Sequence, residues 1–282
     1  MAGTLFVVGT PIGNLEDLTF RALRTLREVD LIAAEDTRRT AKLLARYEIR
    51  KPLVSLREHN ETREAPRLLA RLAQGQAVAL VSDAGTPGIS DPGARLVNAV
   101  RKAGFPVVPI PGPSAVTAAL SVSGTGADGF VFMGFPPSSG PSRDEWMSRL
   151  AREGRTIVFF ESPHRIDRTV RDVLEVKEPI FIHNELTKIH ETCIISTKNE
   201  IPDRKLGRGE FTVVVPGLDE QASSIDESGI SELYFKLVSG ASFDQEEAKT
   251  LTARAHAVST SLVRKIVKKS QILAKRQNKV ST

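Results

Sequence analysis

Short apolar runs alternate with amphipathic segments through the first 122 residues. Each run is bounded by Gly, Pro or charged residues, which is typical of a buried strand. The segments between the runs space their apolar residues three or four positions apart, which indicates helices that cover a sheet. The expected strands lie at 4–8, 29–34, 53–56, 77–81 and 107–110. This alternation predicts a mostly parallel sheet with helices on both faces.

Polar residues mark where these helices begin. Thr19 precedes the periodic residues Ala22, Leu23 and Leu26 and is expected to cap a helix. Asp36 or Thr37 is expected to cap the next one. A further helix is expected over 64–74. Asp91, followed by a proline, predicts an N-cap with proline at the first position of a helix that runs to Lys102.

The second half of the chain has a different pattern. Strands are expected at 130–135 and 156–160, as a pair within 179–197, and within 208–217, with helices at 144–152 and after the turn at 161–165. Neighbouring strands with short connections favour a mixed or largely antiparallel sheet. Residues 124–129 match G-x-G-x-x-G but follow a helix and precede a strand, the reverse of a dinucleotide site, so we interpret them as a linker. The expected division is therefore 1–122, 123–217 and 218–282.

The C-terminal part changes from acidic to basic. Residues 218–247 hold eight acidic residues and one lysine, which indicates a linker with one short helix at 232–238. Two helices are expected at 244–259 and from 261, joined by Ser-Thr-Ser. This pair resembles a helix-turn-helix unit that binds nucleic acid. A structural helical pair with a solvated basic face is an equal alternative.

Composition narrows the class of protein. The 282 residues include a single cysteine, which excludes a disulfide framework and a cysteine-rich zinc site. The sequence shows neither a signal peptide nor an apolar run of roughly 18 residues, so we expect a cytoplasmic protein without a membrane span. From Lys249 onward there are nine Lys and Arg and no Asp or Glu, whereas the preceding 248 residues carry 30 basic and 34 acidic residues. A polyanionic partner is therefore expected at the tail.

Three loops rich in glycine and proline follow expected strands. The densest, at 82–93, holds Gly85, Gly88 and Gly93 with two prolines and two aspartates. The others are at 9–14 and 111–115. Glycine permits close approach of backbone to a ligand, and ligands of open α/β sheets bind at the carboxyl ends of strands. An ordinary strand–turn–helix connection is the alternative.

Four charges gather where the second strand ends, at Glu35, Asp36, Arg38 and Arg39. They indicate either a reactive group or a solvated helix start with salt bridges. His59 lies in a polar loop, where a histidine is more often solvated than catalytic. No spacing of His, Cys and Asp predicts a metal site.

Six stretches, in this order, resemble the tetrapyrrole methylase superfamily, and more closely its branch of ribosomal RNA small subunit methyltransferases I. They are GTPIGNLEDLT from Gly9, AEDTRRT from Ala34, SDAGTPGISDPG from Ser82, IPGPSA from Ile110, FESPHR from Phe160 and ELTK from Glu185. The resemblance covers roughly residues 4–217. Asn184 departs from it, because an arginine is expected before the ELTK stretch.

The resemblance implies two α/β domains with S-adenosylmethionine between them, commonly in a homodimer. It implies methyl transfer to a cytidine ribose 2′-hydroxyl of 16S rRNA in the 30S subunit. A base near a sugar hydroxyl helps such a transfer. The first candidate is Asp36, because the adjacent arginines would hold phosphates, with a charge-pair role equally open. The alternative candidates are Asp83, Glu161, His59 and His164.

The resemblance implies a set of cofactor-binding residues, and together with the charged cluster at 35–39 and the basic tail it leads us to expect a set of RNA-binding residues. The cofactor set is Gly9, Thr10, Pro11, Gly13, Asp83, Ala84, Gly85, Ile89, Ser90, Asp91, Pro111, Gly112, Ser114, Ala115, Phe160, Glu161, Ser162, Pro163, Glu185, Leu186 and Thr187. The RNA set is Arg38, Arg39, Arg165, Lys188, Arg264, Lys265, Lys268 and Lys269. Two other functions stay open: a C-methyltransferase for a tetrapyrrole, and a non-catalytic RNA-binding protein.

Overall fold

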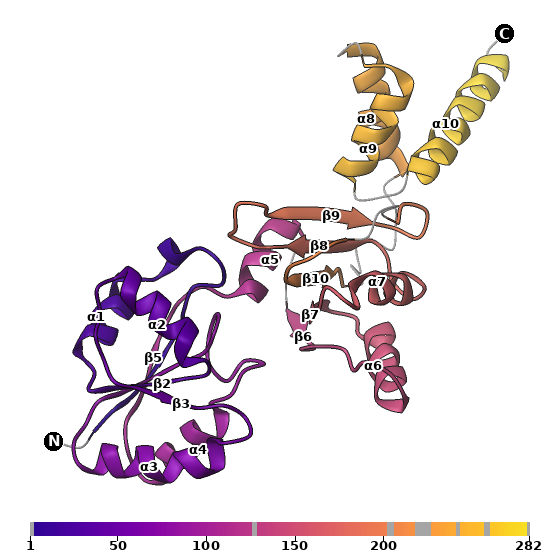
Figure 1. The fold of residues 1–282 in the computed structure, drawn as a ribbon. Coiled ribbons are helices and arrows are strands. Elements are labelled where there is room, and N and C mark those ends of the chain that lie inside the picture. The colour runs from indigo at the N-terminus through magenta and orange to yellow at the C-terminus, as the bar shows by residue number, and fades with distance from the viewer. Residues whose placement is uncertain are drawn as a thin grey trace. The chain divides into compact units, whose positions relative to one another are not determined.

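The computed structural model describes residues 3–125, 129–201, 206–217, 227–240, 243–256 and 260–280 (Figure 1). The chain forms two units. The first comprises Met1–Val122 with His183–Thr192, and the second comprises Ser123–Ile182 with Cys193–Thr282. Among the described residues, no helix combines the length and the apolar character needed to cross a bilayer.

A five-stranded parallel sheet forms the centre of the first unit, with the strand order β3-β2-β4-β1-β5. Its strands are β1 (Leu5–Val8), β2 (Leu31–Ala34), β3 (Leu53–Ser55), β4 (Val78–Val81) and β5 (Val107–Ile110). Strands β2 and β4 are buried at every position, as a sheet covered on both faces requires. The predicted parallel sheet is confirmed.

Helices cover the two faces of this sheet in pairs. The helices are α1 (Phe20–Glu28), α2 (Thr37–Arg46), α3 (Glu61–Ala73), α4 (Ala94–Lys102) and α5 (Ala115–Ser123), with a 3₁₀ turn at Leu15–Asp17. Apolar residues of α1 and α2, including Leu26 and Leu44, share one cluster with one face of the sheet. Those of α3 and α4, including Leu68 and Leu96, share another cluster with the opposite face.

The second unit contains a mixed sheet with the order β6-β7-β10-β8-β9. Strands β6 and β7 are parallel, and β7 and β10 are antiparallel. The strands are β6 (Phe130–Phe132), β7 (Thr156–Glu161), β8 (Ile180–Asn184), β9 (Thr192–Ser196) and β10 (Phe211–Val215), and the helices beside them are α6 (Pro141–Arg152) and α7 (Ile166–Leu174). The predicted mixed sheet is confirmed.

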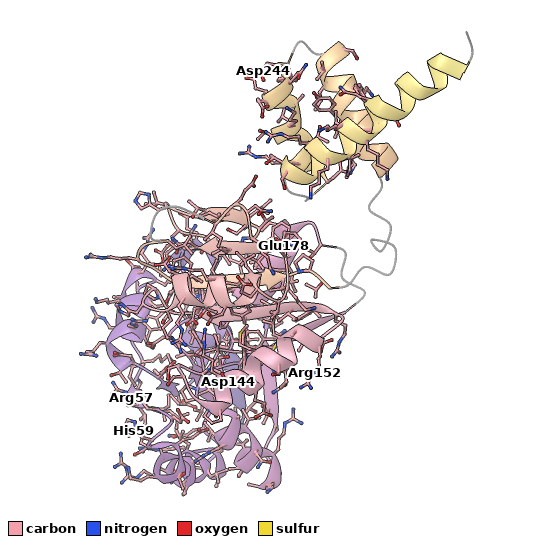
Figure 2. All side chains as sticks on the ribbon, turned by 90° about the vertical axis from the view of Figure 1, so that its right-hand side faces the viewer. Arg57, His59, Asp144, Arg152, Glu178 and Asp244 are labelled. Atoms are coloured by element: carbon pink, nitrogen blue, oxygen red, sulfur yellow. The ribbon has the colours of Figure 1, made fainter. Side chains whose placement is uncertain are left out.

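The described residues of the C-terminal part form three helices, as the sequence predicted. They are α8 (Glu227–Gly240), α9 (Gln245–Ala255) and α10 (Thr260–Val280). Tyr234, Ala248, Val263 and Ile266 are among the residues of their common apolar cluster. Asp244, labelled in Figure 2, caps α9 through a capping box with Glu247. Both α8 and α10 extend beyond the predicted bounds. Of the linkers predicted at 124–129 and within 218–247, residues 126–128 and 218–226 lie outside the described residues.

In the first unit, two helix starts differ from the sequence prediction, and in the second unit α6 begins three residues before its predicted start at 144. Helix α3 begins at Glu61, three residues early, because its first turn is polar and adds nothing to the apolar period. Asp91 does not cap α4: the helix begins at Ala94, and its N-cap is Gly93, which has a φ of 128° and no side chain to offer. The side chain of Glu61 replaces the cap, since its Oε1 accepts a hydrogen bond from Leu96 N at 2.8 Å.

Glu61→Ala is expected to lower the free energy of unfolding by about 1–3 kcal/mol, because it leaves the buried Leu96 N–H without its acceptor. Glu61 is only 3% exposed, so water does not replace the lost oxygen freely. Glu61→Gln keeps an acceptor at the same place and is the matched control. Urea unfolding of the three proteins measures the effect. Equal losses in both variants would show that the charge, and not the cap, matters.

Candidate functional site

Three loops meet at the carboxyl edge of the first sheet, because β4, β1 and β5 are neighbours. The first and second loops pair through two backbone hydrogen bonds. Thr10 N donates to Gly85 O at 2.8 Å, and Gly85 N donates to Thr10 O at 3.1 Å. The Thr10 hydroxyl also donates to Ser82 O at 3.2 Å. The loops at 9–14 and 82–93 are therefore held together from both sides.

The first and third loops touch through two glycines. A Cβ atom placed on Gly9 would lie 2.9 Å from the N and Cα atoms of Gly112. A Cβ atom placed on Gly112 would lie 2.8 Å from Gly9 O. Both neighbours are backbone, which has little freedom to move aside. We call the loops at 9–14, 82–93 and 111–115, joined in this way, the loop cradle.

The ELTK stretch belongs to the first unit and lies against the first of these loops. Asn14 N donates to Thr187 Oγ1 at 3.1 Å, and a Cβ atom on Gly13 would lie 3.0 Å from Leu186 O. Glu185 and Thr187 have φ angles of 55° and 67°, which side chains rarely adopt. Such strain often marks a functional segment. Lys188, predicted to bind RNA, forms an ion pair with Glu185 at 2.8 Å.

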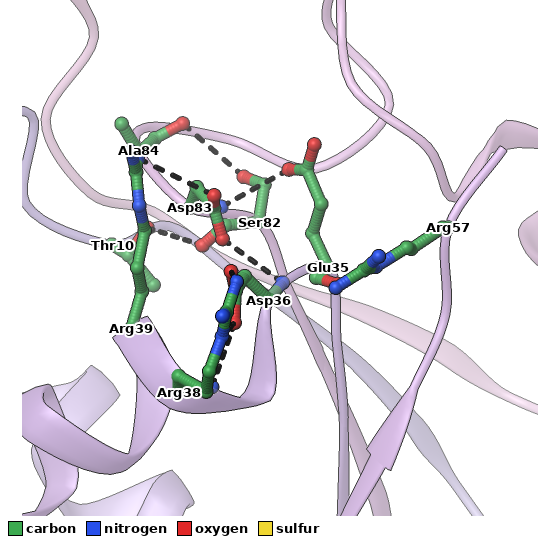
Figure 3. A network of polar contacts seen from close by, with 9 residues as sticks. All are labelled: Thr10, Glu35, Asp36, Arg38, Arg39, Arg57, Ser82, Asp83 and Ala84. Carbon is green, nitrogen blue, oxygen red and sulfur yellow. Dashed lines mark hydrogen bonds and ion pairs between the residues drawn. The ribbon is translucent and has the colours of Figure 1, made fainter.

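Beside the loop cradle, carboxylates and arginines form a network (Figure 3). Asp83 Oδ1 accepts a hydrogen bond from Asp36 N at 3.0 Å, and its Oδ2 lies 3.4 Å from Arg39 Nη1. The Asp83 N–H donates to Glu35 Oε2 at 3.2 Å, and Arg57 Nε donates to Glu35 O at 3.2 Å. The structure thus joins the charged end of β2 to the loop that follows β4.

Asp36 is the N-cap of α2, one of the two residues that the sequence predicted for that role. Its Oδ1 accepts hydrogen bonds from Arg38 N and Nε, and its Oδ2 pairs with Arg38 Nη2 at 2.7 Å. These bonds to Arg38 hold the pKa of Asp36 far below its usual range. A carboxylate stabilised in this way is a weak base.

The pKa values of two other carboxyl groups are raised instead of lowered. Burial, and after it the nearby charge of Glu35, raises the pKa of Asp91 to about 6, although a hydrogen bond with Ser82 opposes the rise. Burial also raises the pKa of Glu35, although the hydrogen bond from the Asp83 N–H opposes that rise. The sequence named Glu35 as a charge but not as a titrating group. Its burial depends on residues far along the chain, which local spacing does not reveal.

In the second unit, the predicted residues Glu161 and Arg165, at the end of β7 and in the turn after it, hold a neighbouring loop in place. Glu161 is 2% exposed, accepts from the Thr169 hydroxyl at 2.7 Å and pairs with Arg165 Nη2 at 2.8 Å. Arg165 Nη1 donates to Pro136 O at 2.9 Å, and the buried Arg143 donates to Pro137 O at 3.0 Å. Two arginines therefore fix the proline loop before α6. Sequence reasoning missed Arg143, which stands in an ordinary polar helix start.

The remaining predicted residues are divided between the two units. Phe160 packs against Phe132 and Phe135, with ring centroids 4.9 and 5.5 Å apart. His59 (Figure 2) and His164 are exposed, in the first and second unit respectively. Over the described ranges, no group of His, Cys, Asp and Glu is arranged to hold a metal ion.

Comparisons with known proteins show which family the chain resembles. Residues 4–202 match the family of tetrapyrrole (corrin/porphyrin) methylases. The chain is 49% identical over 220 residues to a ribosomal RNA small subunit methyltransferase I of Thermotoga maritima, which covers 76% of this chain and 99% of the relative. It is 46% identical over 236 residues to the protein of that name from Neisseria meningitidis serogroup B, with 81% of each chain covered.

Solved structures share the fold at low identity. Diphthine synthase superposes with a TM-score of 0.60 at 16% identity, covering 76% of this chain and 90% of that one. A Thermus thermophilus uroporphyrin-III C-methyltransferase, complexed with S-adenosyl homocysteine, gives a TM-score of 0.53 at 21% identity, with 75% and 97% covered. At these identities the likeness establishes the fold.

The raised pKa of Asp91 predicts a pH-dependent stability. The folded protein favours the protonated form of this carboxyl. The free energy that this preference adds to stability is therefore complete below about pH 4 and is lost as the pH rises through about 6. Asp91→Asn, which carries no charge, is therefore expected to be more stable than the wild type at pH 7. We expect a difference of about 1–2 kcal/mol after allowance for partial exposure, shrinking toward zero at pH 4. Urea unfolding at four pH values checks this, and a difference independent of pH would contradict it.

Proposed function

This chain belongs to the tetrapyrrole (corrin/porphyrin) methylase family, and from that premise we propose that it methylates ribosomal RNA of the small subunit with S-adenosylmethionine as the methyl donor. The finer proposal is methylation of a cytidine ribose 2′-hydroxyl in 16S rRNA. The observation that carries it is the identity of almost half of the residues to relatives named ribosomal RNA small subunit methyltransferase I. The structure adds a loop cradle and a charged network in one unit.

The residues of the loop cradle suit this cofactor chemically. An adenosine with an amino-acid tail needs hydrogen-bond donors and acceptors at both ends. Loops with Gly9, Gly85 and Gly112 bring backbone N–H and C=O groups close to a ligand, and Asp83 and Ser114 add polar side chains. We propose that these loops hold the cofactor in the first unit, with the ELTK stretch beside them. The bound cofactor supplies an electrophilic methyl group on its sulfonium.

The chain's own residues must then position the ribose hydroxyl and remove its proton. A ribose hydroxyl is a weak nucleophile at neutral pH, so a carboxylate that accepts its proton speeds the transfer. Asp36 was the first candidate from the sequence. Because Arg38 and the start of α2 engage both of its oxygens, we favour the charge-pair role for it. Asp91, which has a pKa of about 6, has the basicity that proton acceptance near neutral pH requires.

RNA binding is proposed for two sets of cations. Arg38 and Arg39 stand at the start of α2, beside Asp83. The second set is on α10, where Val263, Ile266 and Val267 are buried and the opposite face is exposed. That exposed face carries Arg264, Lys265, Lys268 and Lys269. The family resemblance also favours a homodimer, which sedimentation would test.

The test of the proposed function is methyl transfer from labelled S-adenosylmethionine to purified 30S subunits that lack ribose methylation. We expect label in 16S rRNA, in a dinucleotide that resists alkaline hydrolysis because its 2′-oxygen is blocked. Subunits that already carry the modification are the control and should take up no label. Label only in a base, or only in an added tetrapyrrole, would overturn the ribose assignment. Cofactor binding without label in RNA would favour a tetrapyrrole methyltransferase, and no cofactor binding at all would favour a non-catalytic RNA-binding protein.

A further inference from the structure

The outer surface of α2 carries a regular row of cations. Arg38, Lys42 and Arg46 are four residues apart and exposed, while Leu43 and Leu44 are buried on the inner face. Residues four apart on a helix share a face and are separated by about 6 Å along its axis. This spacing is comparable with that of successive phosphates on an extended RNA strand. The row begins at the residue that pairs with Asp36 and leads away from the charged network.

Helix α1 lies beside α2 on the same face of the sheet and adds to this surface. Arg21, Arg24 and Arg27 are exposed, whereas Ala22 and Leu26 are buried in the apolar cluster that α1 shares with α2. Arg27 Nη2 donates to the carbonyl of Tyr47, the C-cap of α2, at 3.3 Å. The cations of the two helices therefore form one surface, which we call the α1–α2 basic face.

Acids neutralise only part of this face, where Arg38 pairs with Asp36 and Arg39 with Asp83. Together the two helices contain seven Lys and Arg and a single acidic residue, Glu28. Within the described part of the chain, Lys42 and Arg46 take part in no ion pair. On α3, by contrast, Arg63 and Arg67 both pair with Glu64, at 2.9 and 3.1 Å. An ordinary solvated helix surface pairs its charges as α3 does, so the excess on α1 and α2 favours an anionic partner.

An exposed aromatic ring stands at the start of the same face. Phe20 is the first residue of α1 and is 93% exposed, which is unusual for a large apolar side chain. The Thr19 hydroxyl before it donates to Pro111 O at 3.4 Å, so this end of α1 adjoins the loop cradle. Aromatic rings interleaved with cations are typical of proteins that bind single-stranded nucleic acid, where a base stacks on the ring.

We propose that the α1–α2 basic face binds the RNA strand that flanks the methylated nucleotide. Phe20 stacks against an unpaired base next to the loop cradle, and the cations of α1 and α2 contact successive phosphates. This inference rests on the proposed function, because it takes the anionic partner to be the RNA substrate. It adds a binding surface in the first unit to the one proposed on α10.

The test separates stacking from charge. Phe20→Ala is expected to weaken binding of single-stranded RNA about 5- to 100-fold, without changing the slope of log affinity against log salt, since no charge is lost. The double variant Lys42→Ala, Arg46→Ala is expected to reduce the steepness of that slope by about 1.4. The matched control is Arg101→Ala, Lys102→Ala on α4, on the opposite face of the sheet. It removes two exposed cations and should leave the slope and the methylation KM unchanged.

Three readouts keep the outcomes distinct. Titration with S-adenosylmethionine should give wild-type affinity in all variants, because none touches the loop cradle. Equal losses of slope in the α2 and α4 variants would overturn the inference, since they would indicate a general charge effect. Dissociation of an oligomer by Phe20→Ala would also overturn it, because the ring would then contact a second copy of the chain. If the wild type methylates no RNA at all, the proposed function itself fails, whatever the variants do.

Discussion

The close contact of Gly9 with Gly112 is the constraint on which the site depends. It brings the loops after β1 and β5 together without any side chain between them, and the paired backbone of Thr10 and Gly85 fixes the loop after β4 to the same place. Three segments distant in sequence thus form one rigid rim. The parallel sheet makes this possible, because it places the carboxyl ends of neighbouring strands at one edge.

Charge is divided around that rim. Arginines engage Asp36 and Asp83, while Asp91 and Glu35 are partly buried, and their pKa values are raised. One site therefore offers both fixed negative charges and a carboxyl that titrates near neutral pH. The second unit uses charge differently, since the buried pair of Glu161 and Arg165 anchors a proline loop. Because the methyl group on a sulfonium is already electrophilic, methyl transfer depends mainly on how the protein positions the cofactor and the substrate.

Local sequence patterns predicted the helices and strands well, but they did not predict which distant residues contact one another. Apolar runs and helical spacing predicted both sheets, and Thr19 and Asp36 cap helices because capping is a local interaction. The prediction failed at Asp91, because Glu61 supplies the cap of α4 from another helix 35 residues away. Arg143 was missed for the same reason, since its acceptors lie on other elements. Glycine and proline after the expected strands identified the loops, but only the fold shows which of them touch.

Calorimetric titration of Gly112→Ala with S-adenosylmethionine tests the central claim, that the loop cradle holds the cofactor. The added Cβ would meet backbone at 2.8 Å and push the first and third loops apart. Gly154→Ala, where nothing lies within 4 Å of the added atom, is the control, and thermal unfolding confirms that both variants are folded. We expect at least about tenfold weaker binding in Gly112→Ala only. Wild-type affinity in a folded Gly112→Ala protein would contradict it.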